Sequence, residues 1–251
     1  MPTALVTGAS SGIGREIARR LADDGHHLVV VARREAALRS LADEIGDAEV
    51  IAADLAGRAG RDRLAGAVPA VDVLVNNAGF GDFGPFARAD RDRTMAMLEL
   101  NVAALTDLTH RYLPGMLERG RGRVLNVAST AAFLPGPLMA VYYATKAYVL
   151  SFTEALAEEL RGTGVTATAL CPGPTATGFQ QAADMEMSRL VAGRNLPSAE
   201  EVAAYGVRAM ERGDVIAVPG ALNKVLAASV RAAPRPVLRR MVRAMQSTKE
   251  D

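Results

Sequence analysis

Two side chains near the middle of the chain, Tyr142 and Lys146, have the types and spacing to exchange a proton with a bound molecule. On the helix that this stretch predicts, residues four apart share a face, so phenol and ammonium lie together. A nearby positive charge favours phenolate, so we expect Lys146 to lower the pKa of Tyr142. Such a phenol can donate or accept a proton near neutral pH. Tyr143 lies partly round the helix and is the weaker candidate.

The pair alone also fits an ordinary amphipathic helix with a solvent-exposed lysine. Whether Tyr142 and Lys146 can act on a bound molecule depends on the elements that position them. Apolar runs alternate with helical-period stretches up to about residue 218. Continuous Val, Ile, Leu and Ala runs indicate strands buried on both faces, and their alternation with helices implies a parallel sheet. We expect strands at 4–7, 28–32, 50–53, 71–75, 124–128, 165–170 and 214–218, and helices at 14–24, 35–45, 91–117, 142–161 and 198–212. This pattern predicts a Rossmann fold, a doubly wound α/β sheet of about seven parallel strands with helices on both faces. Ligands bind such sheets at the carboxyl ends of the strands.

A glycine-rich turn follows the first strand and opens a helix, in the pattern Gly-x-x-x-Gly-x-Gly. Glycines let the backbone approach a pyrophosphate, and helix N-terminal amides attract the anion. The expected phosphate-binding residues are Gly8, Ser10, Ser11, Gly12, Ile13 and Gly14. A tight connection between strand and helix, with no ligand, is the alternative.

The residues after the second and third strands bear on the choice of nicotinamide cofactor. An acidic residue after the second strand normally binds the ribose 2′-hydroxyl, but here Arg33 and Arg34 follow it. Arginine can pair with a 2′-phosphate, so we expect NADP(H) to be preferred over NAD(H), with Arg33 the better candidate. One or both arginines could instead cap the next helix. Asp54 and Leu55 are expected beside the adenine, although Asp54 could also serve as a helix N-cap.

In this order the motifs resemble the short-chain dehydrogenase/reductase family, in its compact form, over residues 3 to about 220. The resemblance rests on the glycine turn, Asn76-Asn77-Ala78-Gly79, Asn101, Ser129, Tyr142-x-x-x-Lys146 and Pro172-Gly173 with Thr177. It implies an NAD(P)-dependent oxidoreductase with Ser129, Tyr142, Lys146 and Asn101 as the catalytic set. The further cofactor contacts that it implies are Asn77, Ala78, Gly79, Tyr142, Lys146, Pro172, Gly173, Thr175 and Thr177.

Reduction of a ketone or aldehyde requires a hydride from the nicotinamide and a proton on the emerging alkoxide. Tyr142 is expected to supply that proton, and to accept it in alcohol oxidation, while Ser129 positions the substrate oxygen. The resemblance further implies that Lys146 binds the nicotinamide ribose. It also implies a helix distortion at Asn101, with a water linking Asn101 to Lys146. Ser129 could instead be a loop cap, and Asn101 a surface residue.

Apolar residues near the expected strand ends suggest a hydrophobic carbonyl or alcohol as the small-molecule substrate. These residues are Phe80, Phe83, Phe86, Phe133 and Leu134. By resemblance, residues 178–197 form a substrate lid that also carries Phe179, Met185, Met187 and Leu190.

Composition narrows the other classes of function. The formal net charge of +1 argues against a nucleic-acid partner, and the single cysteine, Cys171, fits a reducing compartment. Strand-like sequence from Thr3 leaves no room for a signal peptide, so we expect a cytoplasmic protein. No metal site is expected, and none of the histidines falls near a motif.

We expect one catalytic domain over residues 1–221 and a basic helical extension over residues 222–251. The extension could contact an anionic membrane or a partner, but packing on its own domain or a sister subunit is favoured. The family resemblance implies a homodimer or homotetramer. Two rival functions remain: a non-catalytic NADP-binding regulatory protein on the same fold, and a methyltransferase with a similar glycine turn.

Overall fold

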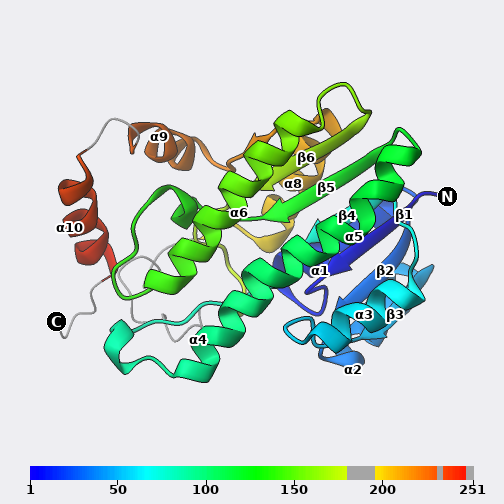
Figure 1. Ribbon diagram of the computed structural model, residues 1–251, viewed down its shortest axis with the longest axis horizontal. Helices are drawn as coiled ribbons and strands as arrows, with labels where there is room; N and C mark the ends of the chain where they lie inside the picture. The colour runs from blue at the N-terminus through cyan, green and yellow to red at the C-terminus, as the bar shows by residue number, and fades with distance from the viewer. Residues whose placement is uncertain (180–195, 231–233, 247–251) are drawn as a thin grey trace.

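A computed structural model of the protein describes residues 1–179, 196–230 and 234–246. Within these residues, all strands lie parallel in one sheet of order β3-β2-β1-β4-β5-β6-β7 (Figure 1). The strands are β1 Thr3–Thr7, β2 His27–Ala32, β3 Ala48–Ala52, β4 Val73–Asn76, β5 Gly122–Val127, β6 Val165–Leu170 and β7 Ile216–Ala217. The strand order reverses between β1 and β4, where a doubly wound sheet forms its ligand crevice. The predicted Rossmann fold is confirmed.

Helices alternate with the strands along the chain, close to the positions that the sequence predicts. They are α1 Gly12–Asp23, α2 Glu35–Ile45, α3 Arg58–Ala67, α4 Arg91–Leu98, α5 Leu105–Glu118, α6 Ala140–Glu159, α8 Ala199–Arg212, α9 Ala221–Ser229 and α10 Arg235–Gln246. Short 3-10 turns occupy Phe86–Arg88 and Thr130–Phe133, and a π-helical segment, Glu99–Ala104, joins α4 to α5. Helix α3 is missing from the sequence prediction, because its glycines and its two buried residues, Arg61 and Leu64, give no apolar stripe.

Each face of the sheet is covered by its own helices (Figure 1). On one face, Ile17 of α1, Leu38 of α2 and Val207 of α8 share a fully buried core with the strands. On the other, Leu64 of α3, Leu108 of α5 and Leu156 of α6 form a second core, which contains side chains of β1, β2, β4, β5 and β6. Both layers leave the carboxyl ends of the central strands free to form a site.

Buried side-chain amides tie the central strands to the helices. Asn76 Nδ2 donates to Asn126 Oδ1 at 2.9 Å, which joins β4 to β5, and also to Thr109 Oγ1 of α5 at 3.0 Å. Asn126 Nδ2 in turn donates to Thr153 Oγ1 of α6 at 2.9 Å. Because each amide group is buried, these bonds fix the relative positions of elements that meet at the strand ends.

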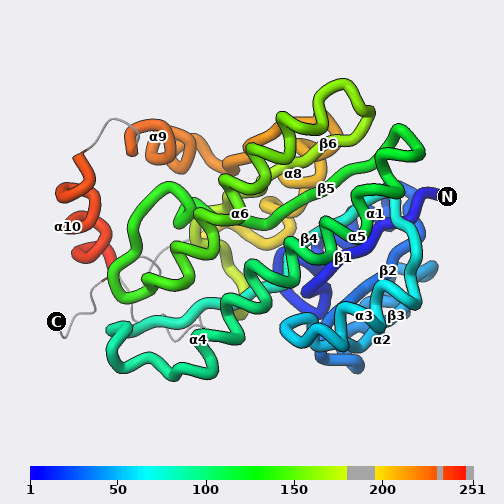
Figure 2. The backbone as a smooth tube through the Cα atoms, viewed as in Figure 1, coloured from blue at the N-terminus to red at the C-terminus, as the bar shows by residue number. Residues whose placement is uncertain are grey.

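The C-terminal residues form helices α9 and α10 (orange and red in Figure 2), and α10 lies next to the N-terminal end of α6. Where the catalytic domain ends, placed at residue 221 from the sequence, stays a prediction. Residues 180–195 of the predicted lid, with Met185, Met187 and Leu190, lie outside the described residues. None of the helices that the structure describes is long and apolar enough to cross a bilayer.

Candidate active site

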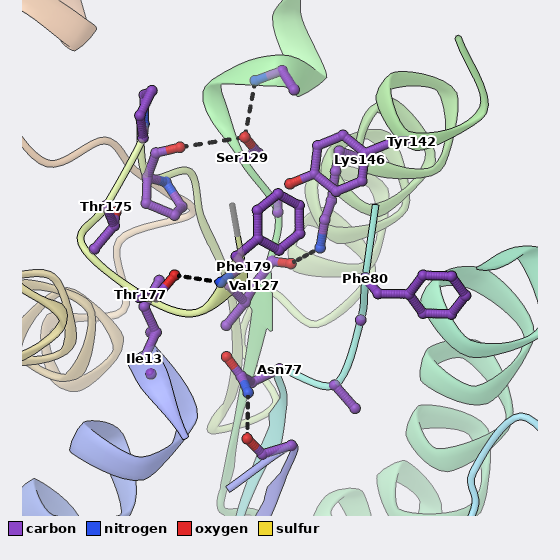
Figure 3. Close-up of a pocket in the computed structure, with 18 of the residues that line it drawn as sticks. Ile13, Asn77, Phe80, Val127, Ser129, Tyr142, Lys146, Thr175, Thr177 and Phe179 are labelled. Atoms are coloured by element: carbon purple, nitrogen blue, oxygen red, sulfur yellow. Dashed lines mark hydrogen bonds between the residues drawn. The ribbon is translucent and has the colours of Figure 1, made fainter. Parts of the chain in front are cut away.

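A cavity of about 810 Å³ opens at the carboxyl ends of the strands and extends from the glycine turn to the first turns of α6 (Figure 3). Its lining includes Ser129, Tyr142, Lys146 and every predicted cofactor-binding residue except Gly14. Two predicted site residues, Gly14 and Asn101, therefore lie behind the wall of the cavity. Volumes of a few hundred to about 1,000 Å³ are typical of small-molecule sites.

The glycine turn is shaped by close contact with Asn77. Gly8 adopts a φ of +68°, which favours glycine, and Asn77 Nδ2 donates to the carbonyl oxygen of Thr7 at 2.9 Å. A Cβ atom at Gly14 would collide with Asn77 Nδ2 and with the carbonyl oxygen of Gly8. Gly14 is thus required by packing between α1 and the end of β4, and it needs no direct ligand contact.

The N-terminus of α1 faces the cavity with its backbone amides uncapped by a side chain. Its N-cap residue, Ser11, makes no side-chain capping bond, and Ser10 and Ser11 both line the cavity. Arg34 Nη2 donates to Ser10 Oγ at 3.1 Å and to Ser11 Oγ at 2.8 Å. A phosphate group at this position would meet helix amides, two hydroxyls and a guanidinium.

Arg33 and Arg34 both line the cavity, and Arg34 occupies the backbone N-cap position of α2 without a side-chain capping bond. The alternative role of Asp54 as an N-cap is wrong, because α3 begins at Arg58 with Gly57 as its N-cap. Instead, Asp54 Oδ1 accepts a hydrogen bond from Ala56 N at 3.1 Å, which shapes the turn after β3. Asp54 and Leu55 also line the cavity.

Tyr142 and Lys146 are both buried on the cavity side of α6, and Lys146 Nζ lies 5.8 Å from the centre of the Tyr142 ring. Lys146 Nζ donates to the backbone oxygen of Val127, at the end of β5, at 2.7 Å. Figure 3 shows that bond and the Tyr142 hydroxyl directed into the cavity. Tyr143, the competing tyrosine, accepts a hydrogen bond from Gln246 Nε2 of α10 at 2.6 Å. The hydroxyl groups of the two tyrosines therefore have different neighbours, although both rings lie in one apolar cluster and line the cavity.

The predicted lowering of the Tyr142 pKa by Lys146 is wrong for this arrangement. Burial raises the pKa of the Tyr142 phenol well above its ordinary value, and the nearby Ser129 hydroxyl offsets only part of that rise. Burial also lowers the pKa of Lys146 from 10.5 to about 8, because the ammonium group has lost its water. The two residues share a face of α6 as their spacing predicts, but spacing alone does not give the cost of removing a charged group from water.

Ser129 performs the capping role considered from the sequence and also lines the cavity. Its Oγ accepts a hydrogen bond from Ala131 N at 3.1 Å, at the start of the 3-10 turn Thr130–Phe133, and donates to the Pro172 carbonyl oxygen at 3.3 Å. These bonds hold the hydroxyl between the ends of β5 and β6 (Figure 3). Capping and substrate contact are therefore compatible uses of one side chain.

Asn101 lies inside the π-helical segment, where the resemblance implies a distortion, and it is 2% exposed. Its amide is held by Phe80 on both sides, since Oδ1 accepts from Phe80 N at 3.1 Å and Nδ2 donates to Phe80 O at 2.9 Å. Nδ2 also donates to Thr145 Oγ1 of α6 at 3.1 Å. The surface alternative for Asn101 is wrong. A side chain at Gly79 would meet both Asn101 Oδ1 and Lys146 Nζ, so the two groups converge there.

The segment after β6 lines the cavity and contacts the glycine turn. Thr177 Oγ1 accepts a hydrogen bond from Phe179 N at 3.2 Å, and its side chain lies against Gly12 of the glycine turn. Thr175 is 5% exposed and donates to the Gly173 carbonyl oxygen at 2.9 Å. Pro172, Gly173, Thr175 and Thr177 thus reach the cavity as predicted.

The part of the cavity beyond Tyr142 is mostly apolar. Of the predicted apolar residues, Phe80, Leu134 and Phe179 line it, whereas Phe83 and Phe133 pack into neighbouring clusters and Phe86 is 66% exposed. Sequence reasoning missed a group of residues from the C-terminal helices that also line it, namely Leu222, Asn223, Leu226, Val242 and Met245. The spacing of Leu238 and Val242 on one face of α10 was the available signal that this helix packs inward.

Known proteins resemble this chain in sequence and in fold. Residues 2–188 match the family model described as short chain dehydrogenase. The chain is 38% identical over 209 residues to an uncharacterized oxidoreductase of Bacillus subtilis, covering 81% of this chain and 78% of that protein. It is 39% identical over 175 residues to an NADP-dependent 3-hydroxy acid dehydrogenase of Escherichia coli, covering 67% of this chain and 71% of that protein.

Among solved structures, a short-chain dehydrogenase from Sphingobium yanoikuyae in complex with NADPH superimposes with a TM-score of 0.84. The two sequences are 29% identical, and the match covers 100% of each chain. These similarities remove the methyltransferase alternative. The chain belongs to the short-chain dehydrogenase family of oxidoreductases.

Proposed function

We propose that this protein is an NADP(H)-dependent oxidoreductase that interconverts a ketone or aldehyde and the corresponding alcohol. The carrying observation is that one cavity contains the uncapped N-terminus of α1, the arginines after β2, and the side chains of Ser129, Tyr142 and Lys146. A dinucleotide and a small substrate would meet in such a cavity at the switch point of the sheet.

The residues present fit a dinucleotide with a 2′-phosphate. The backbone amides of α1 would bind the pyrophosphate, and Arg33 and Arg34 would bind the 2′-phosphate. Arg34 is already oriented by its bonds to Ser10 and Ser11. The name of the Escherichia coli relative and the NADPH complex of the Sphingobium yanoikuyae protein support the same preference. Asp54 and Leu55 would flank the adenine.

When bound, NADP(H) supplies or accepts the hydride at its nicotinamide ring. In carbonyl reduction, Tyr142 would donate its phenolic proton to the substrate oxygen. The Ser129 hydroxyl would turn from the Pro172 carbonyl oxygen and donate its hydrogen bond to the same substrate oxygen. The raised pKa of Tyr142 keeps the phenol protonated at neutral pH, which is the form that proton donation needs. In the reverse direction Tyr142 would act as the base.

Lys146 would bind the nicotinamide ribose and bring a positive charge next to Tyr142. We assign Asn101 a positioning role, since it fixes Phe80 and Thr145 and converges with Lys146 at Gly79. A water between Asn101 and Lys146 would complete a route by which Tyr142 recovers its proton. The apolar lining beyond Tyr142 supports a hydrophobic carbonyl or alcohol as substrate.

Assembly as a homodimer or homotetramer through α5 and α6, and a cytoplasmic location, stay predictions. So does the absence of a nucleic-acid partner. The buried face of α10 favours packing of the extension on its own domain over membrane contact.

The test compares Tyr142→Phe with Tyr148→Phe, a matched change on the same helix, where the Tyr148 hydroxyl bonds Thr106 at 2.9 Å. NADPH oxidation is followed by absorbance over a panel of ketones and aldehydes. We expect kcat to fall at least about 100-fold in Tyr142→Phe, because proton transfer contributes about 10²–10⁴ in rate, with little change in NADPH affinity. Tyr148→Phe should retain activity.

Unchanged turnover in Tyr142→Phe would overturn the mechanism. Tight NADPH binding by the wild-type protein with no turnover of any carbonyl or alcohol would favour the non-catalytic regulatory alternative instead.

A further inference from the structure

Helix α10 buries three uncharged side chains on one side and exposes its arginines. Leu238, Val242 and Gln246 follow one another at four-residue spacing and are all buried. The arginines of the helix, Arg235, Arg239, Arg240 and Arg243, are all exposed. The helix lies beyond residues 2–188, which carry the family match, so the match assigns it no role.

The inner side of α10 reaches the substrate end of the cavity. Val242, which is 2% exposed, packs in one cluster with Met139, Tyr142 and Tyr143, and Val242 and Met245 both line the cavity. Figure 1 shows α10 beside the N-terminal end of α6, which carries both tyrosines. A change in the volume of Val242 or Met245 would therefore change the space beyond Tyr142.

One buried hydrogen bond connects this helix to α6. Gln246 Nε2 donates to the Tyr143 hydroxyl at 2.6 Å, and Gln246 is fully buried. Tyr143 is itself held from its other side, since a side chain at Gly136 would overlap the Tyr143 ring. Gln246 is thus anchored to a side chain that has little freedom to move. Its Oε1 has no hydrogen-bond partner among the described residues, so within that part of the chain the Tyr143 bond is the one hydrogen bond of its side-chain amide.

The described lining around Val242 and Met245 favours an apolar group of the substrate. Among the described lining residues, the cations are Arg33 and Arg34, at the adenosine end, and Lys146, which bonds Val127. The arginines of α10 point to solvent, and Val242 and Met245 present only apolar atoms.

We propose that α10 is the specificity-determining wall of the substrate site. Val242 and Met245 limit the size of the substrate's apolar body, and the Gln246–Tyr143 bond holds that wall in position. This inference rests on the proposed carbonyl reductase activity and names the part of the chain that selects the carbonyl compound.

The test uses cyclohexanone as the small ketone and benzophenone as the large one. The measured quantity is the ratio of kcat/KM for benzophenone to that for cyclohexanone, with NADPH. Val242→Ala enlarges the cavity, Val242→Leu reduces it, and Gln246→Leu removes the bond to Tyr143. Arg239→Ala, on the exposed side of the same helix, is the matched control.

We expect the ratio to rise about tenfold in Val242→Ala, since one or two methyl groups in an apolar pocket discriminate by about 10–200-fold. It should also rise in Gln246→Leu and fall in Val242→Leu. The change in the ratio should come from KM. The value of kcat and the NADPH dissociation constant should stay within about twofold of wild type, because the wall does not touch the reacting atoms. Arg239→Ala should leave the ratio unchanged. A ratio that stays within twofold in all three inner-side variants, or that moves equally in Arg239→Ala, would overturn the proposal.

Failure of the proposed activity would be visible separately, as absence of NADPH oxidation with every ketone. Calorimetric titration of the same two ketones into protein saturated with NADP⁺ requires no turnover, because no hydride is available in that complex. If the affinity ratio shifts among the variants as above, α10 selects ligand size whatever the reaction. If it does not shift, the wall proposal fails on its own.

Discussion

Replacing Lys146 with methionine should make the cofactor-free protein less sensitive to pH between about 8 and 10.5. Burial lowers the pKa of Lys146 from 10.5 to about 8, so below pH 8 the folded protein carries a charge that has lost its water. That drop corresponds to roughly 3 kcal/mol of unfolding free energy. Methionine has a similar length and no charge, so Lys146→Met removes this cost.

The sign follows from proton binding. Between about pH 8 and 10.5 the unfolded chain binds the Lys146 proton and the folded chain does not, so wild-type stability rises with pH in that window relative to the variant. The stability difference, variant minus wild type, should therefore shrink by roughly 3 kcal/mol from pH 7 to 10.5. The lost bond to the Val127 carbonyl oxygen shifts the whole curve but does not alter its slope.

The assay is urea unfolding of both proteins, without cofactor, at half-unit steps from pH 7 to 10.5. Lys224→Met is the control, because Lys224 lies on α9 with its side chain exposed. A Lys146→Met difference that is flat across the range would show that Lys146 is not desolvated in the folded protein. In the same variant, reduction of ketones should be lost, because Lys146 would no longer bind the nicotinamide ribose.

Three further substitutions test the cofactor site and its supports. Arg34→Ala should weaken NADPH binding about 10–100-fold more than NADH binding, since bonds to charged groups contribute about 1.5–3 kcal/mol. Fluorescence titration measures both affinities, Arg39→Ala is the control, and equal loss for the two cofactors would contradict a 2′-phosphate role. Gly14→Ala should lower the free energy of unfolding by about 1–3 kcal/mol and weaken NADPH binding, because the added methyl group displaces Asn77. Urea unfolding and fluorescence titration measure the two effects, and wild-type values for both would argue against the collision. Asn126→Leu should lower the free energy of unfolding by about 1–3 kcal/mol, because the amide of Asn76 and the hydroxyl of Thr153 lose a partner. A change below about 0.5 kcal/mol in urea unfolding would mean that these buried hydrogen bonds contribute little to stability.

Much of the fold is contained in local sequence pattern. Buried strands of a parallel sheet are continuous apolar runs, and the prediction for β6, Val165–Leu170, coincides with the strand observed. The start of α8 was equally readable, since Ser198 and Glu201 form the capping box that their spacing allows. Helix α3 was not, because it buries Arg61, whose Nε bonds Asp107 of α5 at 2.9 Å. A charged residue paired at long range leaves no periodic apolar signal.

The sequence predicts which residues line the site where their position in the backbone determines the contact. It does not predict the properties that depend on how deeply a side chain is buried. Residues at the ends of β1, β4, β5 and β6 reach the cavity because the parallel sheet brings those ends together. The pKa of Tyr142 depends on how completely surrounding residues exclude water, and the C-terminal part of the cavity depends on a contact across 103 residues between Tyr143 and Gln246. Neither quantity is present in a motif.

The same contact separates the two adjacent tyrosines more firmly than helical spacing does. A proton donor must present its hydroxyl to the substrate, whereas Tyr143 Oη already accepts a bond from Gln246 and its ring is confined by Gly136. Tyr142 has Ser129 and Lys146 as neighbours instead, and its hydroxyl faces the cavity. The hydroxyl groups of these two consecutive residues of α6 have different partners. One turn of the helix can therefore carry both the proposed proton donor, Tyr142, and the residue that holds α10 in place, Tyr143. A substitution at Tyr143 should therefore change which carbonyl compound is accepted, and one at Tyr142 should change whether any is reduced.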